Sequence, residues 1–194
     1  MFTRIVISLL FATMATSWSQ VSNPILNPIS SEKHKSIVFD GKEYFLTDTG
    51  SHAGGEFARF ILKGEDTEKY TTKLGTLLCV SAISNDPIET AKFARDELIK
   101  NPSLVFQEIL INKAAPAAIF FFGFRFSDGD YQLNIWKYEK RMYGIFCDQV
   151  MIAAPKSVQT PGAFKSWAYG LKLDMVNKLT NAHWPPSSNQ SFIE

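Results

Sequence analysis

Apolar and polar residues alternate in short runs through most of residues 36–152, which is the pattern of β-strands that bury one face. Asp40-Gly41 separates two such runs and is typical of a two-residue hairpin turn. The segment from Thr47 to Gly55 contains three glycines and is expected to be a loop. The pattern predicts these strands: 36–39, 43–46, 56–63, 74–83, 104–111, 118–126, 131–139 and 142–152.

The first of two predicted helices has clear boundary signals. Asp86 can cap it, Pro87 suits its first turn, and Glu89 completes an Asp-x-x-Glu capping box. Apolar residues then recur with three-four spacing until the helix is stopped at Pro102. The sequence therefore predicts an amphipathic helix between the fourth and fifth strands.

The second predicted helix begins near Thr160 and runs to about Asn181, with apolar residues again at three-four spacing. Strands, a helix, an antiparallel meander and a helix thus follow one another. This order predicts a single α+β domain over residues 36–182, in which two amphipathic helices pack on an antiparallel β-sheet meander.

The first 19 residues have the order of an export signal. Arg4 precedes a compact apolar run at Ile5–Ala12, and small residues follow it. This order predicts cleavage by a signal peptidase before Gln20, with a cut before Trp18 as the close alternative. An uncleaved membrane anchor needs about 20 apolar residues, and polar residues interrupt this run earlier. We therefore expect a periplasmic or extracellular protein.

The predicted domain is flanked by segments without regular structure. Residues 20–35 contain two Asn-Pro pairs, which block helix and strand, so they form an extended lead-in. Residues 183–194 are rich in Pro, Ser and Asn and are expected to be a flexible tail. After signal cleavage no second apolar stretch of membrane length is left.

The composition excludes several classes of protein. The chain has 194 residues, of which 45% are hydrophobic and 20% charged, so it is neither a disordered chain nor a collagen-like fibre. With 20 basic and 19 acidic side chains, it has no electrostatic reason to bind nucleic acid or an anionic membrane. Removal of the signal takes away one basic group and leaves the two signs equal.

Three short segments carry a resemblance to a known family. They are Phe-Ile-Leu-Lys-Gly-Glu at 60–65, Tyr-Thr at 70–71, and Tyr-Gln-Leu-Asn-Ile-Trp at 131–136. With the capped helix and meander, they make the stretch from Ile37 to Leu179 resemble exported bacterial proteins of the PsbP-like α/β sandwich type. The resemblance implies that fold and a non-catalytic accessory role. It implies no catalytic residues, because this group has no shared active-site motif.

The sequence contains no recognised catalytic, cofactor or metal motif. The three histidines, His34, His52 and His183, are scattered and have no second ligand at the spacing of a zinc site. Nucleophile elbows and phosphate-binding glycine loops are also missing from the sequence. Paired carboxylates need no local motif, so glycoside hydrolysis stays open. We expect no metal, no cofactor and no assignable catalytic residue.

The two cysteines, Cys79 and Cys147, both lie in apolar strand-like runs. An even number of cysteines in an exported chain favours a disulfide. The alternative is two separately buried thiols, which are common in protein cores. The sequence leaves both possibilities open, because it does not place the two strands side by side.

The Phe-rich hairpin around Asp128-Gly129 is the most informative segment. With a two-residue turn, Phe124 lies opposite Leu133 and Phe122 opposite Ile135, and this apolar face is expected to meet the helices. The other face combines aromatic, amide and guanidinium groups, which suits recognition. The alternatives are that the chain itself covers this face, or that the face is simply exposed. The candidate binding residues are Phe121, Arg125, Gln132, Asn134, Trp136 and Tyr138.

These observations favour an exported, non-enzymatic protein that binds another protein or a small ligand through one face of its sheet. A small secreted hydrolase with catalytic residues on separate loops is the second hypothesis. The third is an inhibitor or immunity-type protein, for which the Ser51–Gly55 segment is the candidate inhibitory loop.

Overall fold

A computed structural model describes residues 36–52, 55–66, 69–79, 85–112, 115–142, 144–182 and 184. The predicted signal peptide and lead-in lie outside the described residues, as do His34, His183 and the tail after residue 184.

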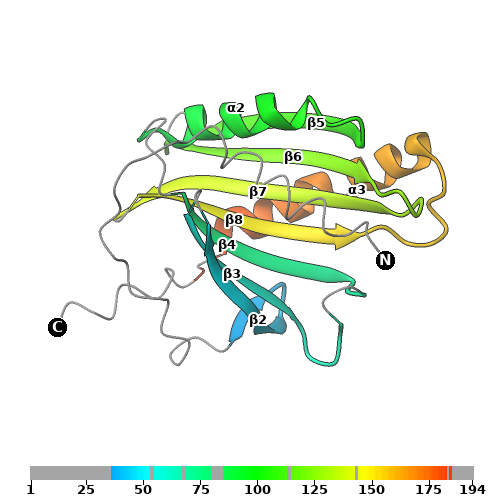
Figure 1. Cartoon of the computed structure of the whole chain (residues 1–194), viewed down its shortest axis with the longest axis horizontal. Coiled ribbons are helices and arrows are strands. Elements are labelled where there is room, and N and C mark those ends of the chain that lie inside the picture. The colour runs from blue at the N-terminus through cyan, green and yellow to red at the C-terminus, as the bar shows by residue number, and fades with distance from the viewer. Residues whose placement is uncertain are drawn as a thin grey trace.

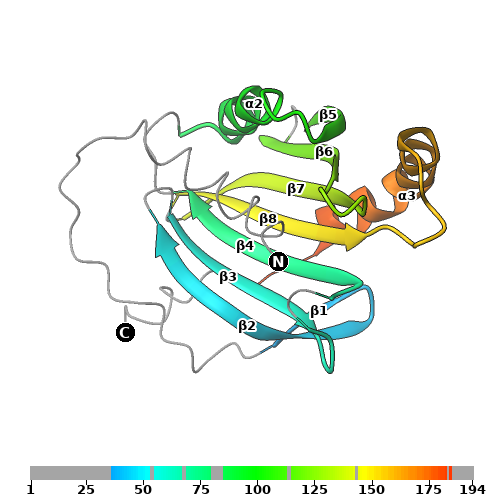
Figure 2. The ribbon, with the colours of Figure 1, turned by 45° about the vertical axis from the view of Figure 1, so that its right-hand side comes forward.

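One antiparallel sheet of eight strands organises the domain, in the order β1-β2-β3-β4-β8-β7-β6-β5 (Figure 1). Its strands are β1 Ser36–Phe39, β2 Lys42–His52, β3 Gly55–Leu62, β4 Thr72–Cys79, β5 Leu104–Asn112, β6 Ala117–Arg125, β7 Tyr131–Arg141 and β8 Gly144–Ala153. Each half of the sheet is a meander, and the two halves join where β4 pairs with β8 (Figure 2). The expected antiparallel α+β architecture is confirmed.

Both helices begin where the sequence predicts, and the residue before each one caps it. Helix α2 (Pro87–Leu98) links β4 to β5, and the Ile88 amide donates to Asp86 Oδ1 at 2.8 Å. Helix α3 (Pro161–Asn181) follows β8, and the Ala163 amide donates to Thr160 Oγ1 at 3.2 Å. These side chains satisfy amides that the first turn of a helix leaves without a partner.

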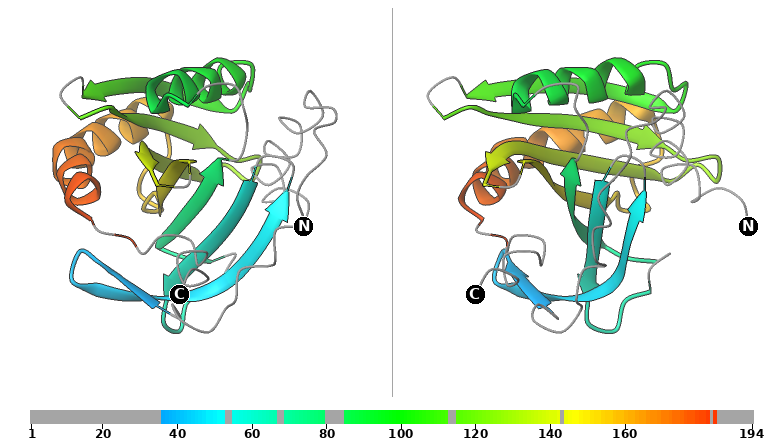
Figure 3. Two further views of the ribbon diagram at one scale, coloured as in Figure 1. Left: turned by 90° about the vertical axis from the view of Figure 1, so that its left-hand side faces the viewer. Right: turned by 60° about the vertical axis from the view of Figure 1, so that its left-hand side comes forward.

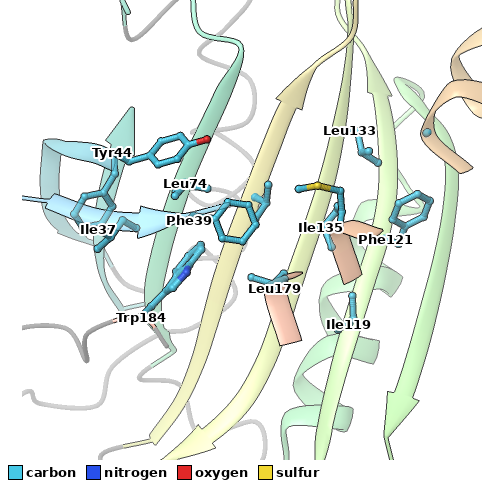
Figure 4. Close-up of a cluster of buried hydrophobic side chains, with 14 of the residues drawn as sticks. Ile37, Phe39, Tyr44, Leu74, Ile119, Phe121, Leu133, Ile135, Leu179 and Trp184 are labelled. Carbon is cyan, nitrogen blue, oxygen red and sulfur yellow. The ribbon is translucent and has the colours of Figure 1, made fainter. Parts of the chain in front are cut away.

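The two helices lie on opposite faces of the sheet (Figure 3). The buried residues of α2 share one cluster with Phe120, Phe122 and Phe124 of β6. Those of α3 share another with Phe121 of β6 and Leu133 of β7 (Figure 4). We call these the α2 face and the α3 face. The expectation that a single face meets both helices is wrong, because neighbouring residues of β6 point to opposite faces and both sets are apolar.

The first hairpin folds over the far part of the α3 face. Ile37, Phe39 and Tyr44 are buried there, and the ring of Trp184 meets that of Phe39 edge-on at 6.1 Å (Figure 4). Lys178 near the end of α3 forms an ion pair with Asp40 in the hairpin turn, at 2.9 Å.

The segment expected as a loop at Thr47–Gly55 is mostly strand. β2 continues to His52 and pairs with β3 through a bulge between Leu46 and Asp48. Gly50 allows close approach of β3, since a Cβ at this position would lie 2.9 Å from Phe57 Cζ. Glycine here reflects close packing rather than a loop. The two residues that bound the candidate inhibitory segment, Ser51 and Gly55, therefore belong to β2 and β3.

No helix in the part of the chain that the structure describes is long and apolar enough to cross a membrane.

Candidate functional site

The β6–β7 hairpin has a register different from the one predicted. The Phe126 amide donates to the Asp130 carbonyl at 2.8 Å, and the Gly129 amide donates to the Phe126 carbonyl at 3.0 Å. Three residues therefore form the loop, with Gly129 at φ +91°, as in hairpins that end in a left-handed residue. One extra loop residue changes every cross-strand pair: Phe122 lies opposite Asn134, and Phe120 opposite Trp136.

This register separates the six candidate binding residues onto two faces. Phe121 and Arg125 lie on the α3 face, whereas the other four lie on the α2 face. All six except Arg125 are buried: Phe121, Gln132, Asn134, Trp136 and Tyr138. The structure therefore does not bring these residues together as one open surface.

The two buried amides of this set form hydrogen bonds inside the protein. Tyr70 Oη donates to Gln132 Oε1 at 2.5 Å, and Gln132 Nε2 donates to Asn134 Oδ1 at 2.7 Å. Amides with such partners contribute to a specific packing arrangement on the α2 face.

Cys79 and Cys147 lie on neighbouring strands, and both are free thiols in the structure. Cys147 is opposite Leu77 and Cys79 is opposite Ile145, so the two cysteines are diagonal neighbours on the α2 face. Diagonal positions are roughly 7–8 Å apart between Cα atoms, more than the roughly 4.4–6.8 Å of a disulfide. Pairing in the exported form would need the strands to shift, and it stays a prediction.

A different group of side chains, at one end of the α3 face, has more of the features of a functional site. It combines Glu56 of β3, Asp148 of β8 and three residues of β7, and we call it the charged cluster. Its members, Glu56, Lys137, Glu139, Arg141 and Asp148, are largely withdrawn from solvent. Buried charges are costly unless they are paired, and such groups often mark functional sites.

Strand pairing explains how Lys137, Glu139, Arg141 and Asp148 meet and where Glu56 lies relative to them. Lys137, Glu139 and Arg141 occupy alternate positions of β7 and so point to one face. Lys137 lies opposite Asp148 on β8, and Asp148 lies opposite Thr76 on β4. The row next to it runs from Glu139 through Phe146 and Leu78 to Glu56. The cluster therefore extends across four adjacent strands.

Asp148 is the centre of the ion pairs. It is 1% exposed, accepts a hydrogen bond from Thr76 Oγ1 at 3.0 Å, and is paired with the Arg141 guanidinium. Lys137 Nζ lies 3.8 Å from Asp148 Oδ2 and 3.1 Å from Glu139 Oε2. Arg141 Nε donates to Glu139 Oε1 at 2.7 Å. Two cations thus bridge two carboxylates.

The protonation equilibria of the two central carboxyls shift in opposite directions. Burial raises the pKa of Asp148 and outweighs the charges of Arg141 and Lys137, which act to lower it. Burial also acts to raise the pKa of Glu139, but Arg141 and Lys137 prevail there and lower it. Burial, without a nearby cation to oppose it, raises the pKa of Glu56. These differences follow from the balance between burial and the nearby cations at each carboxyl.

Two atoms of the charged cluster lack hydrogen-bond partners. Glu56 Oε2 and Arg141 Nη1 are buried, and neither has a partner among the residues that the structure describes. The guanidinium of Arg141 lies over the ring of Phe146, 4.7 Å from its centroid. An acceptor and a donor are therefore both unused at the same end of the α3 face.

Sequence reasoning missed the charged cluster, although part of its signal was visible. Lys137, Glu139 and Arg141 alternate with residues of the opposite face, which is the pattern of a polar stripe on a strand. Asp148 stands as a lone acid within an apolar run. Recognising their contact requires the β7–β8 register, and Glu56 is more than 80 residues away along the chain.

Within the described residues, no group of three or more His, Cys, Asp or Glu side chains is arranged to hold a metal ion. The side chain of His52 lies outside the described part of the structure. No protein-family model matches this chain, and no curated protein is significantly similar to it in sequence.

Proposed function

We propose that this protein is an exported, non-catalytic binding protein whose charged cluster binds a small polar ligand. The observation that carries the proposal is the pair of unused atoms, Glu56 Oε2 and Arg141 Nη1. Leaving a buried polar group without a partner costs about 1–3 kcal/mol, and more for a charged group. A ligand that displaces the groups covering these two buried atoms and supplies both missing partners would recover this free energy on binding.

The two unused atoms define the chemistry of the ligand. The guanidinium of Arg141 suits a carboxylate or phosphate oxygen. The Glu56 carboxylate oxygen suits an ammonium or hydroxyl donor. The strands that carry them are three places apart in the sheet, roughly 14 Å at a spacing of about 4.8 Å. The Arg141 guanidinium lies over Phe146 of β8, which is one strand closer to β3. A ligand therefore has to span about 10 Å between this guanidinium and the Glu56 carboxylate.

The internal pairing of the charged cluster favours binding over catalysis. A general acid or base must reach the substrate proton within hydrogen-bond distance. Both oxygens of Asp148 are already engaged, one by Thr76 Oγ1 and the other by Arg141. The resemblance to PsbP-like proteins, which implies an accessory role, agrees with this proposal.

A hydrolase remains the second candidate, and one observation favours it. The pKa of Asp148 is raised while that of Glu139 is lowered, and an acid–base pair requires such a difference. A hydrolase would lose all turnover of a glycoside substrate in both the Asp148→Asn and Glu139→Gln variants. A binding protein would show no turnover in the wild type.

The export part of the proposal rests on residues 1–19. Expression of the full chain in a bacterium with a periplasm, followed by amino-terminal sequencing of the periplasmic fraction, should give a chain that starts at Gln20 or Trp18. A mature chain that still starts at Met1 would contradict export.

A series of ω-amino carboxylates of increasing length tests the binding site directly. Each probe has a carboxylate for Arg141 and an ammonium for Glu56, so affinity should peak at the length that spans the gap. A ligand at 100 times its Kd adds about 2.7 kcal/mol to stability, which raises the melting temperature by about 5–10 °C in a domain of this size. The alkanoate and alkylamine of equal length each lack one charge and should bind at least tenfold more weakly.

Matched variants make this test specific. Arg141→Gln should remove the response to the best probe, whereas Lys140→Gln should keep it. Lys140 is exposed and precedes Arg141 on β7, so it points to the other face. The proposal is wrong if no chain length raises the melting temperature, or if folded Arg141→Gln responds like the wild type.

A further inference from the structure

The two edges of the sheet differ in length and protection. β1 has four residues, and its Ile37 and Phe39 are buried in the same cluster as Trp184. β5 has nine residues, contains neither proline nor lysine, and ends the sheet on the other side. Soluble proteins usually protect an edge strand by shortness, lysine, proline or a covering segment. Among the residues that the structure describes, β5 has none of these features, so this long edge is suited to pairing with another strand.

Helix α3 runs beside this edge. The ring of Tyr169 lies 5.6 Å from that of Phe106 in β5 and 5.5 Å from that of Phe121 in β6. Tyr169 is nevertheless 39% exposed, and Ile111 near the end of β5 is 43% exposed on the α2 face. An added strand would therefore meet an aromatic ring on one side and an isoleucine on the other.

The charges beside the edge are mainly positive. Glu108 is the one acidic residue of β5, and Lys172 neutralises it at 2.7 Å. Lys165 lies 5.8 Å over the ring of Tyr169. The amide of Arg125 in β6 donates to the Ser103 carbonyl just before β5, and its guanidinium lies 5.8 Å from the ring centroid of Tyr131. Lys165 and Arg125 form no ion pair among the residues that the structure describes.

From these observations we propose that β5 is a docking edge, to which an extended acidic segment of another protein adds as a ninth strand. Backbone hydrogen bonds to β5 supply affinity, as in strand addition generally. Acidic side chains on the α3 side face Lys165 and Arg125, and apolar side chains on the α2 side face Ile109 and Ile111. This edge is separate from the charged cluster, so either proposal can fail without the other.

A nine-residue peptide of alternating Glu and Val, with blocked ends and a fluorescent label, is the probe. Fluorescence anisotropy with the purified full chain at low salt should show at least tenfold tighter binding than for the matched Lys-Val peptide. Hydrogen exchange should slow at the amides of Leu104–Asn112 when the Glu-Val peptide is bound, and stay unchanged in β1.

N-methylation of the peptide separates strand addition from simple charge attraction. Alternate amides of a strand point to opposite edges, so methylating one alternate set should abolish binding while methylating the other leaves it within about twofold. The paired variant Lys165→Glu/Arg125→Glu should bind at least fivefold more weakly, and the control Lys140→Glu should bind like the wild type.

Three results would overturn the proposal. The first is absence of binding, or equal binding of the acidic and basic peptides. The second is equal sensitivity to both methylation patterns. The third is a dimer in sedimentation velocity that the variant Ile111→Lys dissociates, because the occupant of the edge would then be a second copy of this chain.

Discussion

Gly123 in β6 offers the sharpest test of how α3 lies on the sheet. A Cβ at this position would lie 2.4 Å from Phe164 Cε1 and 2.5 Å from Phe106 Cε1. Carbon atoms prefer separations of about 3.5–4.0 Å, so Gly123→Ala must push both rings back by about 1 Å. Phe164 is fully buried and stacks on Tyr131 with 4.8 Å between centroids, which leaves its ring little freedom.

We expect Gly123→Ala to lower the free energy of unfolding by about 3 kcal/mol, the upper end of the usual cost of overpacking. For a domain of this size the melting temperature should fall by about 6–12 °C. In a Phe164→Ala background the same change should cost at least about 1 kcal/mol less, because residues in contact are coupled. Urea unfolding followed by circular dichroism measures all four proteins.

Gly170→Ala is the matched control. Gly170 lies within α3, and a Cβ there would have no atom within 4 Å. Alanine favours a helix over glycine by up to about 1 kcal/mol, so this variant should be more stable than the wild type. If Gly123→Ala costs nothing, or costs the same with and without the Phe164 ring, then α3 does not cover β6 as described.

Three further predictions follow from the buried groups. Trp136→Ala should lower the free energy of unfolding by about 3–5 kcal/mol, as much as Phe122→Ala, since the two rings meet edge-on at 4.8 Å; a much smaller loss in thermal melts would place Trp136 outside the core. In the reduced native protein both thiols should react slowly with iodoacetamide at pH 8, because burial raises the pKa of Cys79 to about 12 and that of Cys147 well above its ordinary value. Thiol labelling of the unreduced exported protein in urea tests whether the two cysteines are paired. Two labelled cysteines per chain would contradict the pairing. Burial raises the pKa of Glu56 above its ordinary 4.5, so the folded state holds the carboxyl proton of Glu56 more tightly than the unfolded state does. The wild type should therefore lose stability relative to Glu56→Gln as the pH rises above 4.5. If the two proteins differ in free energy of unfolding by the same amount at pH 4 and pH 7, this prediction is wrong.

Local features of the sequence were sufficient to predict where the elements begin and what type they are. Asp86 caps the first helix as predicted and the second helix begins after Thr160 as predicted, because a helix start depends only on residues within one turn. Alternation likewise predicted most strands, since a half-buried strand needs a polar or apolar residue at every second position. Gly50 misled the prediction, because glycine serves both loops and close strand contacts.

Which face each strand residue occupies was decided by tertiary structure. One more residue in the loop before Tyr131 moved Phe122 from opposite Ile135 to opposite Asn134, because a shift of one residue reverses the two faces of a strand. The sequence also did not distinguish two helices on one face from one helix on each, since both faces of β6 are apolar.

The charged cluster also depends partly on the sequence pattern and partly on the tertiary structure. The strand predicted at 131–139 already places Lys137 and Glu139 on one face, and the structure extends this strand to Arg141. The contacts of Lys137 and Arg141 with Asp148, and the position of Glu56 in the same row as Glu139 three strands away, exist only because β3, β4, β8 and β7 pair in that order. Residues far apart in the chain become neighbours through strand order and register. Burial and the neighbouring charges then shift the pKa values of their side chains.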